Sequence, residues 1–360
     1  MAFNIILNSK LKIFLFVIGI IILLLAMAFI IFRFYLNNYK DPWHEKLAQA
    51  GVTEKNVQIG QVNFNYAEGP DNGPALLLLN AQHMDWYSYS RVMPELSTKF
   101  HVFAVDYPGH GKTTYPEKYP MNANQIGGDL ATLIETVIQE PAYVTGNSSG
   151  GLLTTWLAAN KPELVKAIVL EDPPLFNSEY PKVKETVAYR SFSTAHNYVE
   201  EIENDDFLLY WLESNSAFFE KHAGKFSVPL IKSAVNSYRS SNPGEAVEIS
   251  FLPDTVRLMI RGFNYYDPHF GNAFYDGSWN GDFDHAQALG KITCPALLIH
   301  ANFEILDSGE LYGGLDQDEA DRVVSLIPNC EYIRVDSDHV THLDNPDQFI
   351  QIIEDFFLSE

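Results

Sequence analysis

The sequence predicts an α/β protein with a mostly parallel sheet that is covered by helices on both faces. Short apolar runs alternate with helical patterns from about Val57 to residue 175 and again after residue 286. A strand, a sharp turn and a helix meet at Gly146-Asn147-Ser148-Ser149-Gly150. Between residues 176 and 286 the alternation stops, and helical patterns rich in aromatic residues take its place. We interpret this block as a helical insertion over one edge of the sheet.

The N-terminal segment predicts a membrane anchor. Residues Ile13 to Phe32 carry no charged or strongly polar side chain, and a helix of that length spans about 30 Å, the thickness of a hydrocarbon core. A cleaved signal peptide is the alternative, but the run is long for one and stays apolar beyond Ala28. We therefore expect a retained single-pass helix, with the soluble domain outside the cytoplasm.

Charge and cysteine content limit the classes of partner. The formal net charge of -22 repels phosphate backbones, so we expect no nucleic-acid partner. The two cysteines, Cys294 and Cys330, have no metal-ligand spacing. They could form a disulfide outside the cytosol or remain as two buried thiols, and the sequence does not decide between these states.

The core elements follow from apolar runs and turn residues. Strands are predicted at Val57 to Ile59, at Val62 to Ala67 and at Leu76 to Leu79, the last as a fully buried strand of a parallel sheet. Further strands and helices are then expected in alternation: the strand 101–105, the short strand from Pro141 that leads into the turn at Gly146, the strands 167–170, 295–301 and 331–335, and the helices 92–98, 124–138, 152–159, 317–326 and 346–357.

The turn around Ser148 predicts an exposed nucleophile. A strand that turns at once into a helix brings the two backbones close together, so a Cβ at Gly146 or Gly150 would clash. The residue at the tip is then held in strained backbone geometry with its side chain above the sheet. The N–H of Ser149, at the start of the helix, can stabilise an oxyanion.

Taken together, these motifs resemble the α/β-hydrolase superfamily, specifically its cap-bearing members with a serine nucleophile. The resemblance covers roughly Val57 to the C-terminus. It depends on the elbow around Ser148, on the turn Asp106-Tyr107-Pro108-Gly109-His110-Gly111 and on the segment Asp338-His339-Val340-Thr341-His342. After the membrane anchor at 1–40, which the apolar run predicts, the resemblance implies a hydrolase core at 41–175 and 287–360 and a helical cap at 176–286.

A serine hydroxyl needs a base within hydrogen-bond reach. His339 is the candidate because it lies in the loop after the last predicted strand, at the same sheet edge as Ser148. The resemblance assigns His342 to a second, structural position.

The acid that would orient His339 is less clear. In the resembled family it commonly follows the penultimate strand, and Glu304 occupies that place after Pro295-Ala296-Leu297-Leu298-Ile299. Asp307 lies in the same loop, and Asp172 ends the strand that follows the elbow strand, where some members carry their acid. Glu304 is the first choice, with Asp172 and Asp307 as alternatives.

The oxyanion hole needs a second N–H besides that of Ser149. The resemblance assigns it to the backbone of Gln82, although Asn80-Ala81 replaces the family's His-Gly pair. His83 and Trp86 are expected to line the substrate pocket beside it.

These residues lead to a hypothesis of a membrane-anchored serine hydrolase that acts on a carboxylic ester or related acyl bond. The aromatic insertion favours a small-molecule substrate with an apolar group. No metal motif, phosphate loop or dinucleotide site occurs, so we expect no cofactor. The alternative is a membrane-tethered binding or signalling protein on a hydrolase scaffold, which the missing His-Gly pair favours.

Overall fold

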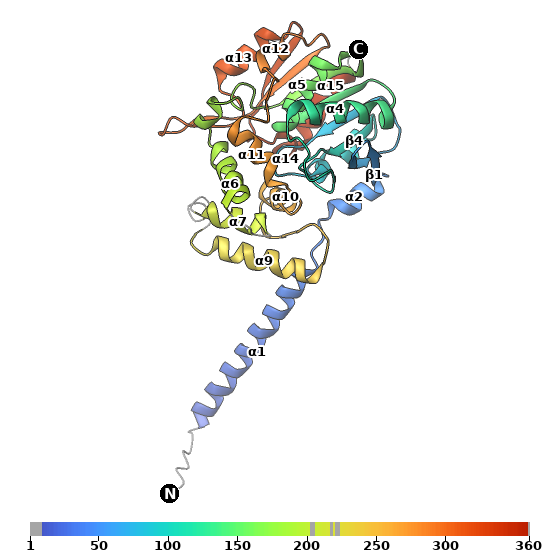
Figure 1. Ribbon diagram of the computed structural model, residues 1–360. Coiled ribbons are helices and arrows are strands. Elements are labelled where there is room, and N and C mark those ends of the chain that lie inside the picture. The colour runs from blue at the N-terminus through green and yellow to red at the C-terminus, as the bar shows by residue number, and fades with distance from the viewer. Residues whose placement is uncertain (1–8, 202–205, 217–218, 220–223, 359–360) are drawn as a thin grey trace.

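A computed structural model describes residues 9–201, 206–216, 219 and 224–358. Helix α1 (Ser9–Asn37) projects away from the rest of the chain, as Figure 1 shows. Within the described residues, the segment Leu11–Asn37 is the one helix long and apolar enough to cross a membrane, and none of its most apolar stretch is buried.

The core is one eight-stranded sheet in the order β1-β2-β4-β3-β5-β6-β7-β10. The pairs β1–β2 and β2–β4 are antiparallel, and the other neighbours are parallel, which confirms the mostly parallel sheet. The strands are β1 (Thr53–Ile59), β2 (Val62–Glu68), β3 (Ala75–Leu79), β4 (His101–Asp106), β5 (Ala142–Asn147), β6 (Val165–Glu171), β7 (Ala296–His300) and β10 (Cys330–Arg334).

Strand β3 shows why its apolar run is continuous. Leu77 and Leu79 pack into the apolar cluster on one face of the sheet, and Leu76 and Leu78 pack into the cluster on the other. Successive side chains of a strand point to opposite faces, so a strand covered on both sides needs apolar residues throughout. The covering helices are α4 (Ala123–Leu133), continued by a π-helical turn η2 (Ile134–Ile138), α5 (Ser149–Asn160), α12 (His285–Leu289) and α13 (Gln317–Leu326) on one side, and α3 (Met93–Leu96) and α15 (Pro346–Leu358) on the other.

The segment between β6 and β7 forms a helical group that lies between the sheet and α1 in Figure 1. Helix α6 packs against α11, and α9 lies beside the end of α1. Its elements are η4 (Lys182–Glu185), α6 (Ala188–Glu201), α7 (Phe207–Ser214), α9 (Ser227–Ser241), α10 (Asp254–Phe263) and α11 (Pro268–Asp276). We call this group the cap helices.

Some boundaries differ from those expected. The predicted cap ends at residue 286, inside α12, which packs against α5 of the core. The helix expected at 92–98 is the shorter α3, preceded by the 3₁₀ helix η1 (Trp86–Arg91). Within the block predicted to be helical at 176–286, residues 202–205, 217–218 and 220–223 lie outside the described residues.

A two-stranded hairpin follows β7, where the sequence predicted only a loop. It consists of β8 (Glu304–Ile305) and β9 (Leu311–Tyr312). The two cysteines are unpaired and half-buried, and burial raises the pKa of each thiol to about 11.

Candidate active site

Ser148 occupies a strained turn between β5 and α5. Its φ of 55° and ψ of -118° lie outside the regions that side-chain-bearing residues normally adopt. A Cβ on Gly150 would lie 2.1 Å from the carbonyl oxygen of Leu79, and one on Gly146 would lie 2.3 Å from the backbone of Gly150. Both glycines therefore permit the close approach that the sequence predicted.

His339 meets a carboxylate directly after β6. Its Nδ1 lies 2.6 Å from Oδ2 of Asp172, whose side chain is almost wholly buried. Asp172 also accepts hydrogen bonds from the backbone N–H of Gly314 at 3.1 Å and of Ala301 at 3.3 Å. Its own φ of 45° is left-handed, and such strain is concentrated at functional sites.

Asn147 connects the serine turn with the histidine loop. Its side-chain Nδ2 donates to the carbonyl oxygen of His339 at 2.8 Å and to that of Glu171 at 3.1 Å. The N–H of Ser148 donates to the same Glu171 oxygen at 3.0 Å. Asn147, the neighbour of Ser148, is thus bonded to the backbone of His339 and to that of Glu171, the neighbour of Asp172, at the carboxyl edge of the sheet.

The environment of His339 favours its protonated form. Burial lowers the pKa of the imidazole, but the hydrogen bond and the negative charge of Asp172 outweigh it, helped by Glu171 and Asp344. The pKa of His339 is therefore raised above its ordinary value of 6.5. The ring is still reachable, since its side chain is 36% exposed.

The carboxylate that contacts His339 is Asp172 and not Glu304, the first choice from sequence. Glu304 lies exposed on β8, where its strand pairs with β9 opposite Tyr312. Asp307 is exposed in the same hairpin. The local reason is that the chain after β7 folds into a hairpin, so its acids face solvent.

A second histidine of the same loop has a separate acid. Nδ1 of His342 lies 2.9 Å from both carboxylate oxygens of Glu171, and both side chains are fully buried. Its ring also stacks on Tyr89, with 4.2 Å between the ring centroids. This pair fixes the loop from inside the core, away from solvent.

The two expected oxyanion donors are linked by a tyrosine. The hydroxyl of Tyr107, after β4, donates to the carbonyl oxygen of Asn80 at 2.9 Å. Because its single proton is used there, Oγ of Ser149 must donate to Tyr107 across their 2.8 Å contact. The loop that carries Gln82 and the start of α5 are therefore held together.

His83 and Trp86 occupy different surroundings. The ring of His83 stacks on Phe263 of the cap helices, with 4.2 Å between centroids, and lies 4.6 Å from the ring of Tyr266. Burial lowers the pKa of His83 well below its ordinary value. Trp86 instead packs in the core, and its indole N–H donates to Glu54 at 3.1 Å.

A pocket of about 490 Å³ lies among the cap helices. It adjoins the site through Tyr266, whose hydroxyl accepts a hydrogen bond from the side-chain amide of Gln82 at 2.5 Å. Its lining combines aromatic rings with charged groups: Tyr198, Phe207, Phe263, Tyr265 and Tyr266 stand beside Glu245 and the ion pair of Arg239 with Asp206. The aromatic rings suit an apolar group of a ligand, and the charged side chains suit a polar one.

Sequence reasoning missed Asn147, Tyr107 and Glu171. Each is a polar residue at or directly after the end of a buried strand, and that position was the signal available. Within the described residues, no group of three His, Cys, Asp or Glu side chains is placed to hold a metal ion.

Proteins that resemble this chain in sequence and in structure share its α/β architecture. The family described as "alpha/beta hydrolase fold" matches residues 74–346, more than half of the chain, so the chain belongs to the α/β hydrolase fold family. It is 25% identical over 300 residues to a pimeloyl-[acyl-carrier protein] methyl ester esterase of Nitrosospira multiformis, covering 83% of this chain and 99% of that one.

Another relative matches more closely over a shorter stretch. A 2-(acetamidomethylene)succinate hydrolase of Mesorhizobium japonicum is 32% identical over 126 residues, which span 35% of this chain and less than half, 45%, of that protein. Among solved structures, the carboxylesterase CesB of Bacillus subtilis superposes with a TM-score of 0.61 at 17% identity, covering 88% of this chain and 96% of CesB. A membrane phospholipase A described as a bacterial virulence factor superposes at 0.55, with 19% identity and coverage of 96% and 98%. At these identities the structures show a shared fold alone.

Proposed function

We propose that the protein is a membrane-anchored serine hydrolase that cleaves a carboxylic ester or a related acyl bond. Ser148 is the nucleophile, His339 the general base and Asp172 the acid that orients His339. The backbone N–H groups of Ser149 and Gln82 form the oxyanion hole. The observation that carries the proposal is the 2.6 Å contact between His339 and the buried Asp172, beside a serine held in a strained turn.

The chemistry follows from these roles. Ser148 Oγ attacks the acyl carbon while His339 removes its proton, and Asp172 stabilises the imidazolium that forms. The protonated imidazole then gives that proton to the leaving alcohol. Water, activated by the same histidine, cleaves the acyl-enzyme and restores the serine. No hydrogen bond joins Ser148 Oγ to His339 among the described residues. Such bonds are often long in free enzymes and tighten when substrate binds.

The substrate class follows from the cap and from the relatives. The aromatic pocket favours an apolar acyl or alcohol group. The relative from Nitrosospira multiformis is named as a methyl ester esterase, and CesB as a carboxylesterase. Helix α1 is the proposed anchor, retained and not cleaved, with the soluble domain outside the cytoplasm.

A fluorophosphonate probe tests the assignment, because it forms a covalent bond only with an activated serine. We expect the folded wild-type protein to be labelled at Ser148, and Ser148→Ala not to be labelled. The matched control is Ser325→Ala, an exposed serine on α13 that should leave labelling unchanged. Absence of labelling on folded wild-type protein would instead support a binding protein on a hydrolase scaffold.

A further inference from the structure

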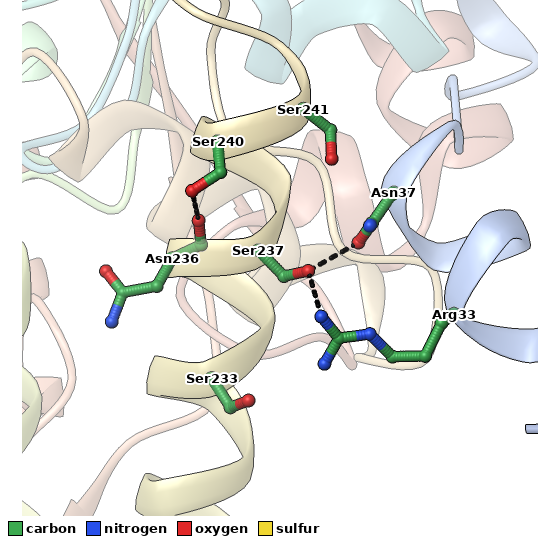
Figure 2. A pocket seen from close by; sticks show the side chains of 7 residues that line it. All are labelled: Arg33, Asn37, Ser233, Asn236, Ser237, Ser240 and Ser241. Carbon is green, nitrogen blue, oxygen red and sulfur yellow. Dashed lines mark hydrogen bonds between the residues drawn. The ribbon is translucent and has the colours of Figure 1, made fainter. Parts of the chain in front are cut away.

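The end of α1 is bonded directly to cap helix α9. Figure 2 shows Ser237 of α9 between two residues of α1: Arg33 donates to its Oγ at 2.8 Å, and that hydroxyl donates to Oδ1 of Asn37 at 2.7 Å. Asn242, just after α9, donates to the carbonyl oxygen of Asn37 at 2.8 Å. The apolar helix therefore meets the cap at a defined contact.

The residues that follow α1 are fixed by buried ion pairs. Asp41 lies 2.8 Å from Arg91 of the core and 3.1 Å from Arg257 of α10, and all three side chains are at most 7% exposed. The N–H of Asp41 also donates to Glu248 at 2.7 Å. Because a charge buried this way is costly to leave unpaired, the orientation of α1 relative to the cap is held.

Helix α9 has two different faces. Its inner face, Val228, Ile231, Val235 and Tyr238, is buried against the other cap helices. Its outer face consists of Pro229, Leu230, Ser233, Asn236, Ser240 and Ser241, and Phe226 directly precedes the helix; all of these residues are exposed. Phe226 is 84% exposed and Leu230 is 55% exposed.

The charge of this segment departs from that of the chain. The protein carries 46 acidic residues against 24 basic ones. The stretch from residue 224 to 242 nevertheless has no Asp or Glu and contains Lys225, Lys232 and Arg239. Lys232 pairs with Glu213 and Arg239 with Asp206 of neighbouring elements, which leaves the positive charge of Lys225 at the start of the stretch. Arg33 stands beside it on α1, with Ser233, Ser237 and Ser240 lining the shared hollow (Figure 2).

We infer that the outer face of α9 rests on the phospholipid headgroups of the bilayer that α1 enters. This inference depends on the proposed anchoring of α1. Exposed Phe226 and Leu230 can enter the boundary between headgroups and acyl chains, as the apolar side chains of interfacial helices do. The hydroxyls of Ser233 and Ser241 and the guanidinium of Arg33 can donate to lipid phosphates, and the outer face of α9 itself carries no carboxylate that would repel them.

This placement deepens the proposed function by naming where the substrate comes from. The cap pocket is lined by Arg239 of α9, and Tyr266 of the same pocket is hydrogen-bonded to Gln82. The pocket therefore lies between the bilayer-facing helix and the oxyanion loop. The substrate class is a membrane-borne acyl lipid, whose chain passes from the bilayer surface into the aromatic pocket.

Quenching by labelled lipids tests the docking without reference to catalysis. An environment-sensitive fluorophore is attached to Phe226→Cys in full-length protein lacking Cys294 and Cys330, reconstituted in phosphatidylcholine–phosphatidylglycerol vesicles with spin-labelled lipid. The matched control is Ile305→Cys, another exposed apolar position, on β8. We expect strong quenching at position 226 and little at 305. Equal quenching at the two positions would overturn the inference.

Activity tests the route of the substrate. The probes are a fluorogenic long-chain ester dissolved in the vesicles and a short water-soluble ester. The exposed variants Phe226→Glu and Ile305→Glu should both fold. For Phe226→Glu we expect roughly tenfold slower turnover of the vesicle ester, in line with losing the burial of one aromatic side chain, and unchanged turnover of the soluble ester.

The outcomes separate the two proposals. Equal losses on both esters, or no loss on either, would overturn the lipid route. If the wild-type protein turns over neither ester, the proposed function fails, and the quenching result alone decides whether α9 docks on lipid.

Discussion

Glu171 and Asp172 are neighbours in the chain, yet their carboxylates hold two different histidines of one loop. Glu171 binds His342 in the fully buried interior, and Asp172 binds His339 at the reachable edge of the sheet. Consecutive side chains at the end of a strand point to opposite faces. Glu171 therefore holds a histidine that supports the loop from the core, and Asp172 holds the histidine at the sheet edge that carries Ser148.

Replacing Asp172 should remove most of the activity. In Asp172→Asn the imidazole loses the carboxylate that orients it and stabilises its charge, so we expect kcat to fall by roughly three to four orders of magnitude. Glu304→Gln changes the exposed acid of β8 and should retain wild-type kcat. Steady-state hydrolysis of an activated ester measures both variants. A large loss in Glu304→Gln with an active Asp172→Asn would reverse the assignment.

We expect kcat/KM to decline as the pH is lowered through the pKa of His339, which lies above 6.5. His339 works as a base only when neutral, and Asp172 raises its pKa above that ordinary value. As the pH falls through this raised pKa, the imidazole becomes protonated and kcat/KM declines. The pH profile of kcat/KM measures the midpoint.

The same profile distinguishes the cause of the shift. Whatever activity remains in Asp172→Asn should show a midpoint at lower pH, because burial, which lowers the pKa of His339, is then less opposed. An unchanged midpoint in that variant would show that another group titrates. Glu304→Gln serves as the control with the wild-type profile.

Tyr107→Phe should slow turnover and leave folding intact. The change removes one hydroxyl that links the Asn80 carbonyl with Ser149, so the two backbone donors proposed for the oxyanion hole, at Gln82 and Ser149, lose a contact that holds their segments together. Loss of one oxyanion donor costs roughly 10² to 10³ in kcat, and we expect about tenfold for this indirect loss. Tyr115→Phe, which removes the hydroxyl that bonds Asp267, is the control. The expected signature is a lower kcat with an unchanged KM.

Gly150→Ala should destabilise the protein, whereas Gly128→Ala should not. A Cβ at Gly150 would lie 2.1 Å from the carbonyl oxygen of Leu79, but one at Gly128 meets nothing within 4 Å. Overpacking of this kind costs about 1 to 3 kcal/mol or more. In a helix interior alanine is favoured over glycine by about 1 kcal/mol. Thermal unfolding of both variants checks the contrast, and an equally stable Gly150→Ala would contradict it.

Much of the fold could be predicted because its signals are local. The run Leu76 to Leu79 shows a strand covered on both faces, and Gly146 and Gly150 show where two backbones meet. Ser148 and His339 follow from similar local patterns. Each residue follows the carboxyl end of a strand, and in a parallel sheet the carboxyl ends of the strands lie along the same edge.

The sequence named Asp172 only as an alternative to Glu304, because the carboxylate that contacts His339 depends on how a distant loop folds. Glu304 has the expected sequence frame, but pairing of β8 with β9 turns it to solvent. The carboxylate of Asp172 is held in place by hydrogen bonds from the backbone N–H groups of Gly314 and Ala301, which are both far along the chain. Likewise, the bond from Asn147 to His339 joins residues 192 positions apart, which no local pattern reveals.

The buried pairing of Asp41 with Arg91 and Arg257 has a mechanical consequence. On the proposed membrane anchor, a flexible tether would let the hydrolase domain move through a volume above the bilayer. A rigid joint would instead fix its height and tilt. The distance by which a substrate protrudes from the bilayer would then decide whether it reaches the site, before the shape of the pocket selects among substrates.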